Sequence, residues 1–139
     1  MATARDVMSK GAKCIGEDQS LMDAAVMMRD MGVGSLPICG SDDRLKGMVT
    51  DRDIVLKCVA EGQNPSDMRA GDCAQGTVHW VDATADVDDA LAIMREHQIK
   101  RLPVIEEHQL VGMISESDLS MSLDETRLSN FVEKVYAAH

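Results

Sequence analysis

The chain has 139 residues, of which 24 are acidic and 14 are Lys or Arg, so its formal net charge is −10. This balance argues against nucleic-acid or anionic-membrane partners, because neutralising phosphate groups requires a basic face. No apolar run approaches the roughly 20 residues needed to span a bilayer, and the N-terminus lacks the charged-then-apolar pattern of a secretion signal. We therefore expect a cytoplasmic protein with no nucleic-acid or membrane partner.

The first half of the chain predicts the order strand, helix, strand, strand, helix. Ser20 and Asp23 form a capping box that starts the first helix, and Gly32 suits the left-handed residue that ends it. The next two strands flank a turn of small polar residues and form a hairpin. The expected elements are strands over Ala12–Gly16, Ser35–Cys39 and Leu45–Val49, and helices over 21–31 and from Asp51.

The second half repeats this order after a linker at 61–69, which contains the turn pair Asn64-Pro65. Asp86 is expected to cap the helix of this half. The expected elements are strands over Thr77–Val81, Arg101–Ile105 and Leu110–Ile114, and helices over 87–97 and from Glu116.

Three further segments lie outside this order. Thr3–Met8 and Ser66–Cys73 are predicted as short helices that lead into each half. In the tail, apolar residues at helical spacing form a stripe that must be covered by the rest of the chain or by a second copy. These residues are Leu128, Phe131, Val132, Val135 and Tyr136.

The two halves have closely similar sequences. Leu36-Pro37-Ile38 corresponds to Leu102-Pro103-Val104, an offset of 66 positions, and after the hairpin residues 47–53 correspond to 112–118, an offset of 65. One half alone, about 65 residues, buries too little apolar surface to be robust. We therefore expect the copies to pack on each other as a two-fold pseudosymmetric body with two related clefts.

Each copy of this motif contains a glycine, a hydroxyl residue and an aspartate: Gly47, Thr50 and Asp53 in the first, and Gly112, Ser115 and Asp118 in the second. Glycine lets a strand approach another backbone or a ligand closely. The carboxylate and the hydroxyl, where a strand passes into a helix, can hydrogen-bond a vicinal diol such as that of ribose, while free helix amides favour phosphate. Alternatively, these polar residues only cap helices, and the two roles are compatible.

Phosphate binding by so acidic a protein requires local cations. Lys100 and Arg101 precede the Leu-Pro strand of the second copy, whereas a Gly-Ser pair stands at 34–35 in the first. Arg52 and Lys13 are further candidates, and each of these side chains can equally be a solvated surface charge. We therefore expect two clefts of unequal chemistry.

Cys14 and Cys39 occur only in the first copy, since Trp80 and Ile105 stand at the corresponding positions of the second. Neighbouring strands of one small sheet would bring the two sulfurs within bridging distance, so a disulfide is one hypothesis and buried free thiols are the alternative. No Cys-x-x-Cys pair is present, and two histidines near the second Leu-Pro strand do not make a metal site, so we expect no metal.

The paired motifs, each a Leu-Pro-hydrophobic strand followed by Gly-hydrophobic-x-Thr/Ser-x-x-Asp, resemble the CBS domain over about residues 4–121. The resemblance implies an α/β (α+β) fold of two tandem repeats, each β-α-β-β-α, packed with pseudo-two-fold symmetry through their sheets. The division expected from it is a first repeat with its lead-in at 1–60, a linker at 61–69, a second repeat at 70–121 and a helical tail at 122–139.

The resemblance also implies an adenosine-containing ligand: AMP, ADP, ATP, NAD or S-adenosylmethionine. Thr50 and Asp53 would hold ribose and phosphate in one cleft, and Ser115 and Asp118 in the other. The strands that would wall the adenine contain Ile15 and Ile38 in the first cleft, and Val81 and Val104 in the second.

No nucleophile elbow or Walker loop is present, so an enzyme is not expected. The resemblance implies a regulatory module without a required cofactor, which dimerises with a second copy and signals to an effector protein that the sequence does not identify. The alternative is a structural, dimerisation or stress-response interaction protein that binds no nucleotide and responds to redox state or metal.

Overall fold

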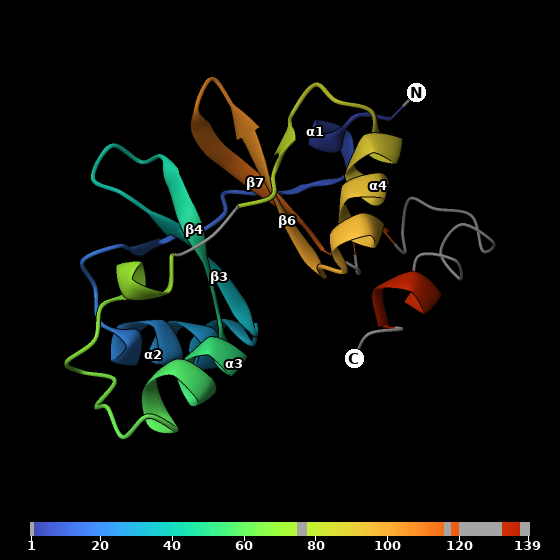
Figure 1. The fold of residues 1–139 in the computed structure, drawn as a ribbon. Helices are drawn as coiled ribbons and strands as arrows, with labels where there is room; N and C mark the ends of the chain where they lie inside the picture. Colours follow the sequence, from blue (N-terminus) through green and yellow to red (C-terminus); the bar gives the residue numbers. More distant parts are fainter. Residues whose placement is uncertain (1, 75–77, 116–117, 120–131, 137–139) are drawn as a thin grey trace. The chain divides into compact units, whose positions relative to one another are not determined.

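The computed structural model describes residues 2–74, 78–115, 118–119 and 132–136, and it divides into two compact units (Figure 1). We call residues 13–78 the N-unit and residues 1–12 together with 79–139 the C-unit. The mixed α/β class expected from the sequence is confirmed, because each unit contains a small sheet and at least one α-helix.

The N-unit is a three-stranded sheet with helical segments. In the order β2-β3-β4, β2 runs parallel to β3 and β4 runs antiparallel to it. The core is mostly aliphatic, with Ile15, Leu21, Leu36, Ile38 and Val49 fully buried. Its elements are β2 (Ile15–Gly16), α2 (Leu21–Met31), β3 (Ser35–Cys39), β4 (Leu45–Thr50), α3 (Asp51–Asp53), a π-helix (Ile54–Val59) and a 3-10 helix (Ala70–Cys73).

The C-unit is a four-stranded sheet in the order β1-β7-β6-β5, in which only the β5–β6 pair is parallel. Its core includes Met94, Leu102, Val104, Ile114 and Val135, all fully buried. Its elements are α1 (Ala4–Val7), β1 (Ser9–Lys10), β5 (Val81–Asp82), α4 (Val87–His97), β6 (Arg101–Glu106) and β7 (Gln109–Ser115).

Local signals fix the ends of the long helix in each unit. The Ser20 hydroxyl accepts a hydrogen bond from the Asp23 amide at 3.0 Å, and Gly32 ends α2 in the left-handed conformation. The Asp86 carboxylate caps α4 by accepting from the Asp88 amide at 2.9 Å. The predicted helices over 21–31 and 87–97 are therefore confirmed.

Several predicted boundaries are wrong. The strands expected over Ala12–Gly16 and Thr77–Val81 are limited to the two residues of β2 and the two of β5, because each is an edge strand with a short parallel partner segment. Of the lead-in expected over Ser66–Cys73, only the last four residues are helical. The helix expected from Asp51 becomes a π-helix after one turn, where the Ala60 amide donates to the Val55 carbonyl at 2.8 Å.

Each unit contains the lead-in segment that precedes the other repeat in the sequence. The segment before the first repeat belongs to the C-unit, where β1 pairs with β7 and the Ala4 amide donates to the Ala85 carbonyl at 2.8 Å. The segment before the second repeat belongs to the N-unit, where the Ala70 amide donates to the Gln19 carbonyl at 2.7 Å. These two hydrogen bonds occupy repeat-equivalent positions, so each unit is completed by a segment that is distant in sequence.

The lead-in segments approach the two sheets most closely at the motif glycines, Gly47 and Gly112. A Cβ added at Gly47 would lie 2.7 Å from the Ala74 Cβ, and one added at Gly112 would lie 2.7 Å from the Ser9 carbonyl oxygen. The close approach expected at both glycines is therefore to another segment of the chain.

The tail and the helix expected from Glu116 fall largely outside the described residues. Asp118–Leu119 and 132–136 are helical, and Val135 is fully buried in the C-unit core, so the body of the chain covers part of the apolar stripe. Among the described residues, none lies in a helix long and apolar enough to cross a membrane.

We predict that Gly112→Ala and Gly47→Ala each lower the free energy of unfolding by about 1–3 kcal/mol, because backbone must move to admit the methyl group. Urea denaturation followed by circular dichroism measures both, and fluorescence of Trp80, the single tryptophan, reports on the C-unit. Gly34→Ala is the control. Its added Cβ meets only the Asp51 side chain, at 3.2 Å, so a change within about 0.5 kcal/mol is expected. Equal losses in all three variants would contradict the packing argument.

Candidate functional site

In the N-unit, the candidate site lies at the junction of β4 and α3. The Thr50 amide donates to Asp53 Oδ2 at 2.9 Å, and the Asp53 amide donates to Thr50 Oγ1 at 3.0 Å. This reciprocal pair is a capping box. It holds the Asp53 carboxylate in a defined orientation in the first helical turn.

The second carboxylate oxygen of Asp53 has a weaker partner. Asp53 Oδ1 lies 3.3 Å from Lys57 Nζ, and the Asp53 side chain is 23% exposed while that of Lys57 is 54% exposed. A solvated ion pair of this kind contributes about 0–1 kcal/mol. A ligand could therefore displace Lys57 at little cost. Lys57 was not among the residues predicted from the sequence, although its i,i+4 spacing from Asp53 is a recognisable signal.

The corresponding site of the C-unit surrounds its aspartate more completely. Asp118 Oδ2 accepts from the Ser115 amide at 2.8 Å and from the Ser115 hydroxyl at 3.0 Å. Asp118 Oδ1 accepts from the Ser9 hydroxyl at 2.8 Å, a contact between residues 109 positions apart. A ribose diol would have to share the carboxylate with these donors or displace Ser9.

The two cations predicted for phosphate differ in their surroundings. Burial lowers the pKa of the Arg101 guanidinium, and the charge of the Asp118 carboxylate opposes this shift, so Arg101 lies within electrostatic range of that aspartate. Lys100 is exposed, and its Nζ lies 4.4 Å from the centre of the Tyr136 ring, in the tail. Arg52 and Lys13 are both exposed side chains of the N-unit.

The apolar residues predicted as adenine walls have buried side chains. Ile15 pairs with Ile38 in the N-unit, and Val81 pairs with Val104 in the C-unit. All four belong to the hydrophobic cores, and none is more than 4% exposed. Only the main chain at these positions could therefore meet a ligand.

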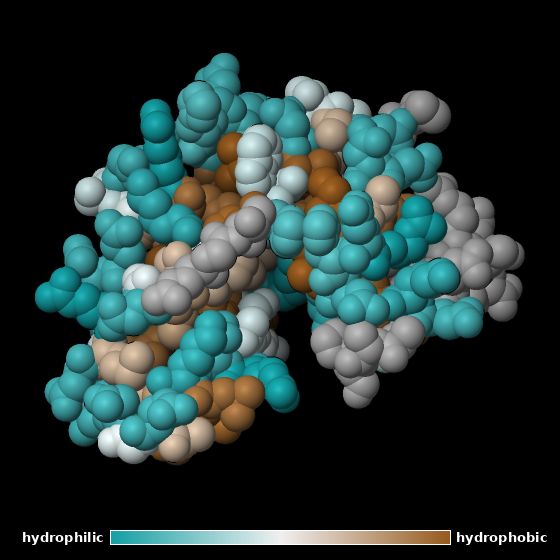
Figure 2. Space-filling model, in the orientation of Figure 1, coloured by the Kyte–Doolittle hydropathy of each residue, from teal (hydrophilic) through white to brown (hydrophobic). Residues whose placement is uncertain are grey.

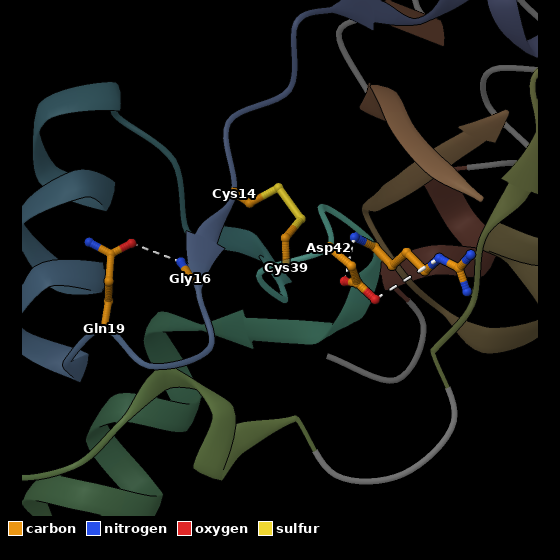
Figure 3. Close-up of a disulfide and its surroundings, with 6 residues drawn as sticks. Cys14, Gly16, Gln19, Cys39 and Asp42 are labelled. Atoms are coloured by element: carbon orange, nitrogen blue, oxygen red, sulfur yellow. Dashed lines mark hydrogen bonds and ion pairs between the residues drawn. A yellow bond between two sulfur atoms is a disulfide. The ribbon is translucent and has the colours of Figure 1, made fainter. Parts of the chain in front are cut away.

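The structure joins Cys14 and Cys39 by a disulfide, with their Cα atoms 5.7 Å apart (Figure 3). Cys14 immediately precedes β2, and Cys39 is the last residue of β3. The bridge therefore crosslinks the parallel strand pair of the N-unit. Cys58 and Cys73 are free and buried in the same unit.

Two histidines meet in the C-unit. The rings of His79 and His97 stack with centroids 3.6 Å apart and an interplanar angle of 15°. Ring-nitrogen lone pairs lie in the ring planes, so nearly parallel rings do not direct them at one tetrahedral ion. Within the described part of the chain, no three His, Cys, Asp or Glu side chains are grouped for a metal. The described residues therefore do not form a complete zinc site.

Comparison with known proteins places these observations in a family. A model of the CBS domain matches residues 4–59 and 70–125, so the chain belongs to the CBS domain family and contains two copies in tandem. This match indicates no catalytic family.

The chain resembles small proteins of similar length. It is 47% identical over 135 residues to hypoxic response protein 1 of Mycobacterium tuberculosis, covering 97% of this chain and 94% of that protein. It is 32% identical over 126 residues to the CBS domain-containing protein YhcV of Bacillus subtilis, covering 88% and 86% respectively.

Two solved structures share the fold. A crystal structure of Hypoxic Response Protein I with two coordinated zinc ions superposes with a TM-score of 0.81 at 50% identity, covering 88% of this chain and 100% of that one. A crystal structure of CBSX2 in complex with AMP superposes with a TM-score of 0.75 at 21% identity, covering 88% and 96%.

We predict that reducing the Cys14–Cys39 bridge lowers the free energy of unfolding by about 3 kcal/mol, because the bridge closes a loop of 25 residues in the unfolded chain. For a chain of this size the thermal midpoint should fall by roughly 10 °C. Calorimetry of oxidised and reduced protein measures the change. The double variant Cys14→Ser/Cys39→Ser should not respond to reductant. An unchanged midpoint on reducing the wild-type protein would contradict the prediction.

Proposed function

We propose that the chain is a non-enzymatic regulatory module that binds an adenosine-containing ligand and signals to an effector protein by a change of conformation. AMP, ADP, ATP, NAD and S-adenosylmethionine are the candidate ligands. The proposal places the module in the cytoplasm.

The observation that supports this proposal best is the Thr50–Asp53 pair. The capping box orients the carboxylate, while its second oxygen faces a solvated lysine. A carboxylate that accepts several hydrogen bonds can hold both hydroxyls of a ribose. The three amides of α3 already donate to the Gly34 carbonyl, the Asp51 carboxylate and the Thr50 hydroxyl, so a phosphate there would rely on side-chain cations.

Membership of the family supports the ligand class. CBSX2, which shares the fold, has been crystallised with AMP. In this chain the two sites offer a ligand different surroundings: Lys57 beside Asp53 in the N-unit, and Ser9 and Arg101 beside Asp118 in the C-unit. We therefore propose unequal affinities, with the N-unit site the more readily occupied.

Signalling requires that the ligand favour one conformation over another, because equal affinity for two states shifts neither. The exchanged lead-in segments supply a physical route. Ser9, which bonds Asp118, lies in the segment that leads directly along the chain into β2 of the N-unit. A ligand that displaced the Ser9 hydroxyl would release part of this segment.

We predict that Asp53→Asn weakens AMP binding at the N-unit site about 10- to 100-fold, because a charge-assisted hydrogen bond to the ribose is lost. Asparagine keeps an oxygen that can accept from the Thr50 amide, so the fold should be retained. Isothermal titration calorimetry measures the affinity, and Asp118→Asn makes the same test for the C-unit.

The matched controls are Asp72→Asn and Asp6→Asn, which alter capping-box aspartates of the two lead-in segments. Neither should change the affinity. Absence of binding by the wild-type protein across all five candidate ligands, or unchanged affinity in both site variants, would contradict the proposal.

A second candidate function is an interaction protein that binds no nucleotide. The capping box favours it, because Thr50 and Asp53 already satisfy each other's main-chain amides. In that case the same titrations give no heat, and Asp53→Asn alters only stability. The zinc ions in the solved Hypoxic Response Protein I suggest a zinc-responsive form of this function, for which the stacked His79 and His97 rings would have to reorient.

We also propose that the module forms a homodimer through the helical face of the N-unit. Six large apolar side chains on this face are 38–56% exposed, and Figure 2 shows apolar surface where α2 and α3 lie in Figure 1. Clustered exposure of this kind marks interaction surfaces. The six are Met22, Val26 and Met31 on α2, and Val55, Leu56 and Val59 on the π-helix.

We predict that Val26→Glu weakens self-association at least about 10-fold, because it places a charge in an apolar contact. Sedimentation velocity over a concentration series measures the dimer fraction. The control is Ala92→Glu, at the equivalent exposed position of α4 in the C-unit, which should leave the dimer fraction unchanged. A wild-type protein that sediments as a monomer would overturn the proposal.

A further inference from the structure

The disulfide lies beside a strand that few other bonds hold in place. β2 has two residues, and its ladder with β3 consists of the pairs Ile15–Ile38 and Gly16–Cys39. Beyond this ladder, the Glu17 amide donates to the Cys39 carbonyl at 2.9 Å. Burial of the Ile15 side chain anchors the strand, and the Cys14–Cys39 bond adds a covalent link at its start (Figure 3).

The C-unit contains the same strand pair without a bridge. Val81 pairs with Val104, and the Ala83 amide donates to the Ile105 carbonyl at 2.9 Å, as Glu17 does to Cys39. Trp80 occupies the position equivalent to Cys14. The repeat therefore forms this strand pair without a disulfide, so the bridge in the N-unit is an addition to the short main-chain pairing that both units share.

The bridged strands are also those expected to border the adenine in the N-unit site. Ile15 and Ile38 expose no side-chain surface, so a ligand there could contact only the main chain of β2 and β3. The position of that main chain depends on how firmly β2 is held.

We propose that Cys14 and Cys39 form a reversible redox site, whose disulfide holds β2 in place for ligand binding in the N-unit and whose reduction weakens that binding. The C-unit site lacks the bridge and does not respond. This regulation rests on the proposed binding of an adenosine-containing ligand.

The chemistry is thiol–disulfide exchange with a dithiol reductant. One thiolate of the reductant attacks the half-buried Cys14 sulfur, and Cys39 leaves as a thiolate that takes up a proton. The second thiol of the reductant then attacks the mixed disulfide and frees Cys14. Two electrons and two protons pass to the protein, and the reductant becomes a disulfide.

The other two thiols do not enter this exchange. Cys58 is fully buried, and Cys73 is 4% exposed. Burial raises the pKa of the Cys73 thiol, and the nearby carboxylate of Asp53 raises it further, so Cys73 remains a protonated, unreactive thiol. Thiol titration of the denatured protein should thus find two thiols, Cys58 and Cys73, in the oxidised form and all four cysteines in the reduced form.

Amide hydrogen exchange tests the effect on β2 without any ligand. Reduction with dithiothreitol should speed exchange of the Glu17 amide at least about 10-fold, because local opening of β2 becomes easier. The equivalent Ala83 amide in the C-unit is the internal control and should be unchanged. Equal protection of Glu17 in both redox states, or four free thiols in protein kept under air, would overturn the inference.

Calorimetry with AMP tests the effect on binding. The Asp118→Asn variant isolates the N-unit site. In this variant, reduction should weaken the binding of AMP at least about 5-fold, as expected if only a fifth of the molecules keep β2 in place. In Asp53→Asn, which isolates the C-unit site, the affinity should not depend on reductant. Cys14→Ser should bind AMP as weakly as the reduced protein under all conditions.

The outcomes separate this inference from the proposed function. If AMP binds the N-unit site equally in both redox states, the redox control is wrong and the binding function stands. If AMP binds neither site in either state, the binding function fails, and the control of ligand affinity fails with it. Faster exchange of Glu17 on reduction would then establish a redox-sensitive strand alone.

Discussion

The reciprocal exchange of lead-in segments is the constraint on which both units depend. The Ala4–Ala85 and Ala70–Gln19 main-chain hydrogen bonds attach each lead-in to the unit of the other repeat. The lead-in segments approach the sheets so closely that glycine is required at 47 and 112, since a Cβ at these positions would clash with Ala74 and with the Ser9 carbonyl, respectively. The C-unit is therefore not a continuous stretch of chain, because it combines residues 1–12 with residues 79–139. A single repeat lacks the segment that completes its own unit.

This exchange explains why two nearly identical motifs provide different sites. Asp118 meets Ser9 because the first lead-in runs beside β7, whereas Asp53 meets Lys57 on its own helical segment. The motif residues of the two copies are equivalent, but the residues that contact them, Ser9 and Lys57, lie in segments whose sequences differ between the copies. Differences in ligand affinity should therefore follow from residues outside the motif.

Features set by neighbouring residues could be predicted from the sequence, and features set by distant ones could not. The Ser20 cap and the Gly32 end of α2 are local signals, whereas the Cys14–Cys39 disulfide was one of two hypotheses, the other being buried free thiols. The extent of β2 was overestimated because an edge strand is defined by its partner. The Ser9–Asp118 contact spans 109 positions and has no local signature, so sequence periodicity could not reveal it.

Capping and ligand binding are compatible roles for these aspartates. A cap holds a carboxylate at a helix N-terminus with one oxygen committed to a main-chain amide, which fixes the direction of the other oxygen. In the N-unit that oxygen faces Lys57, whose solvated ion pair is weak. A binding site needs such a group to be positioned before the ligand arrives, since ordering it afterwards would cost affinity. The capping box at Thr50 and Asp53 therefore supplies the pre-organisation that recognition of a ribose would require.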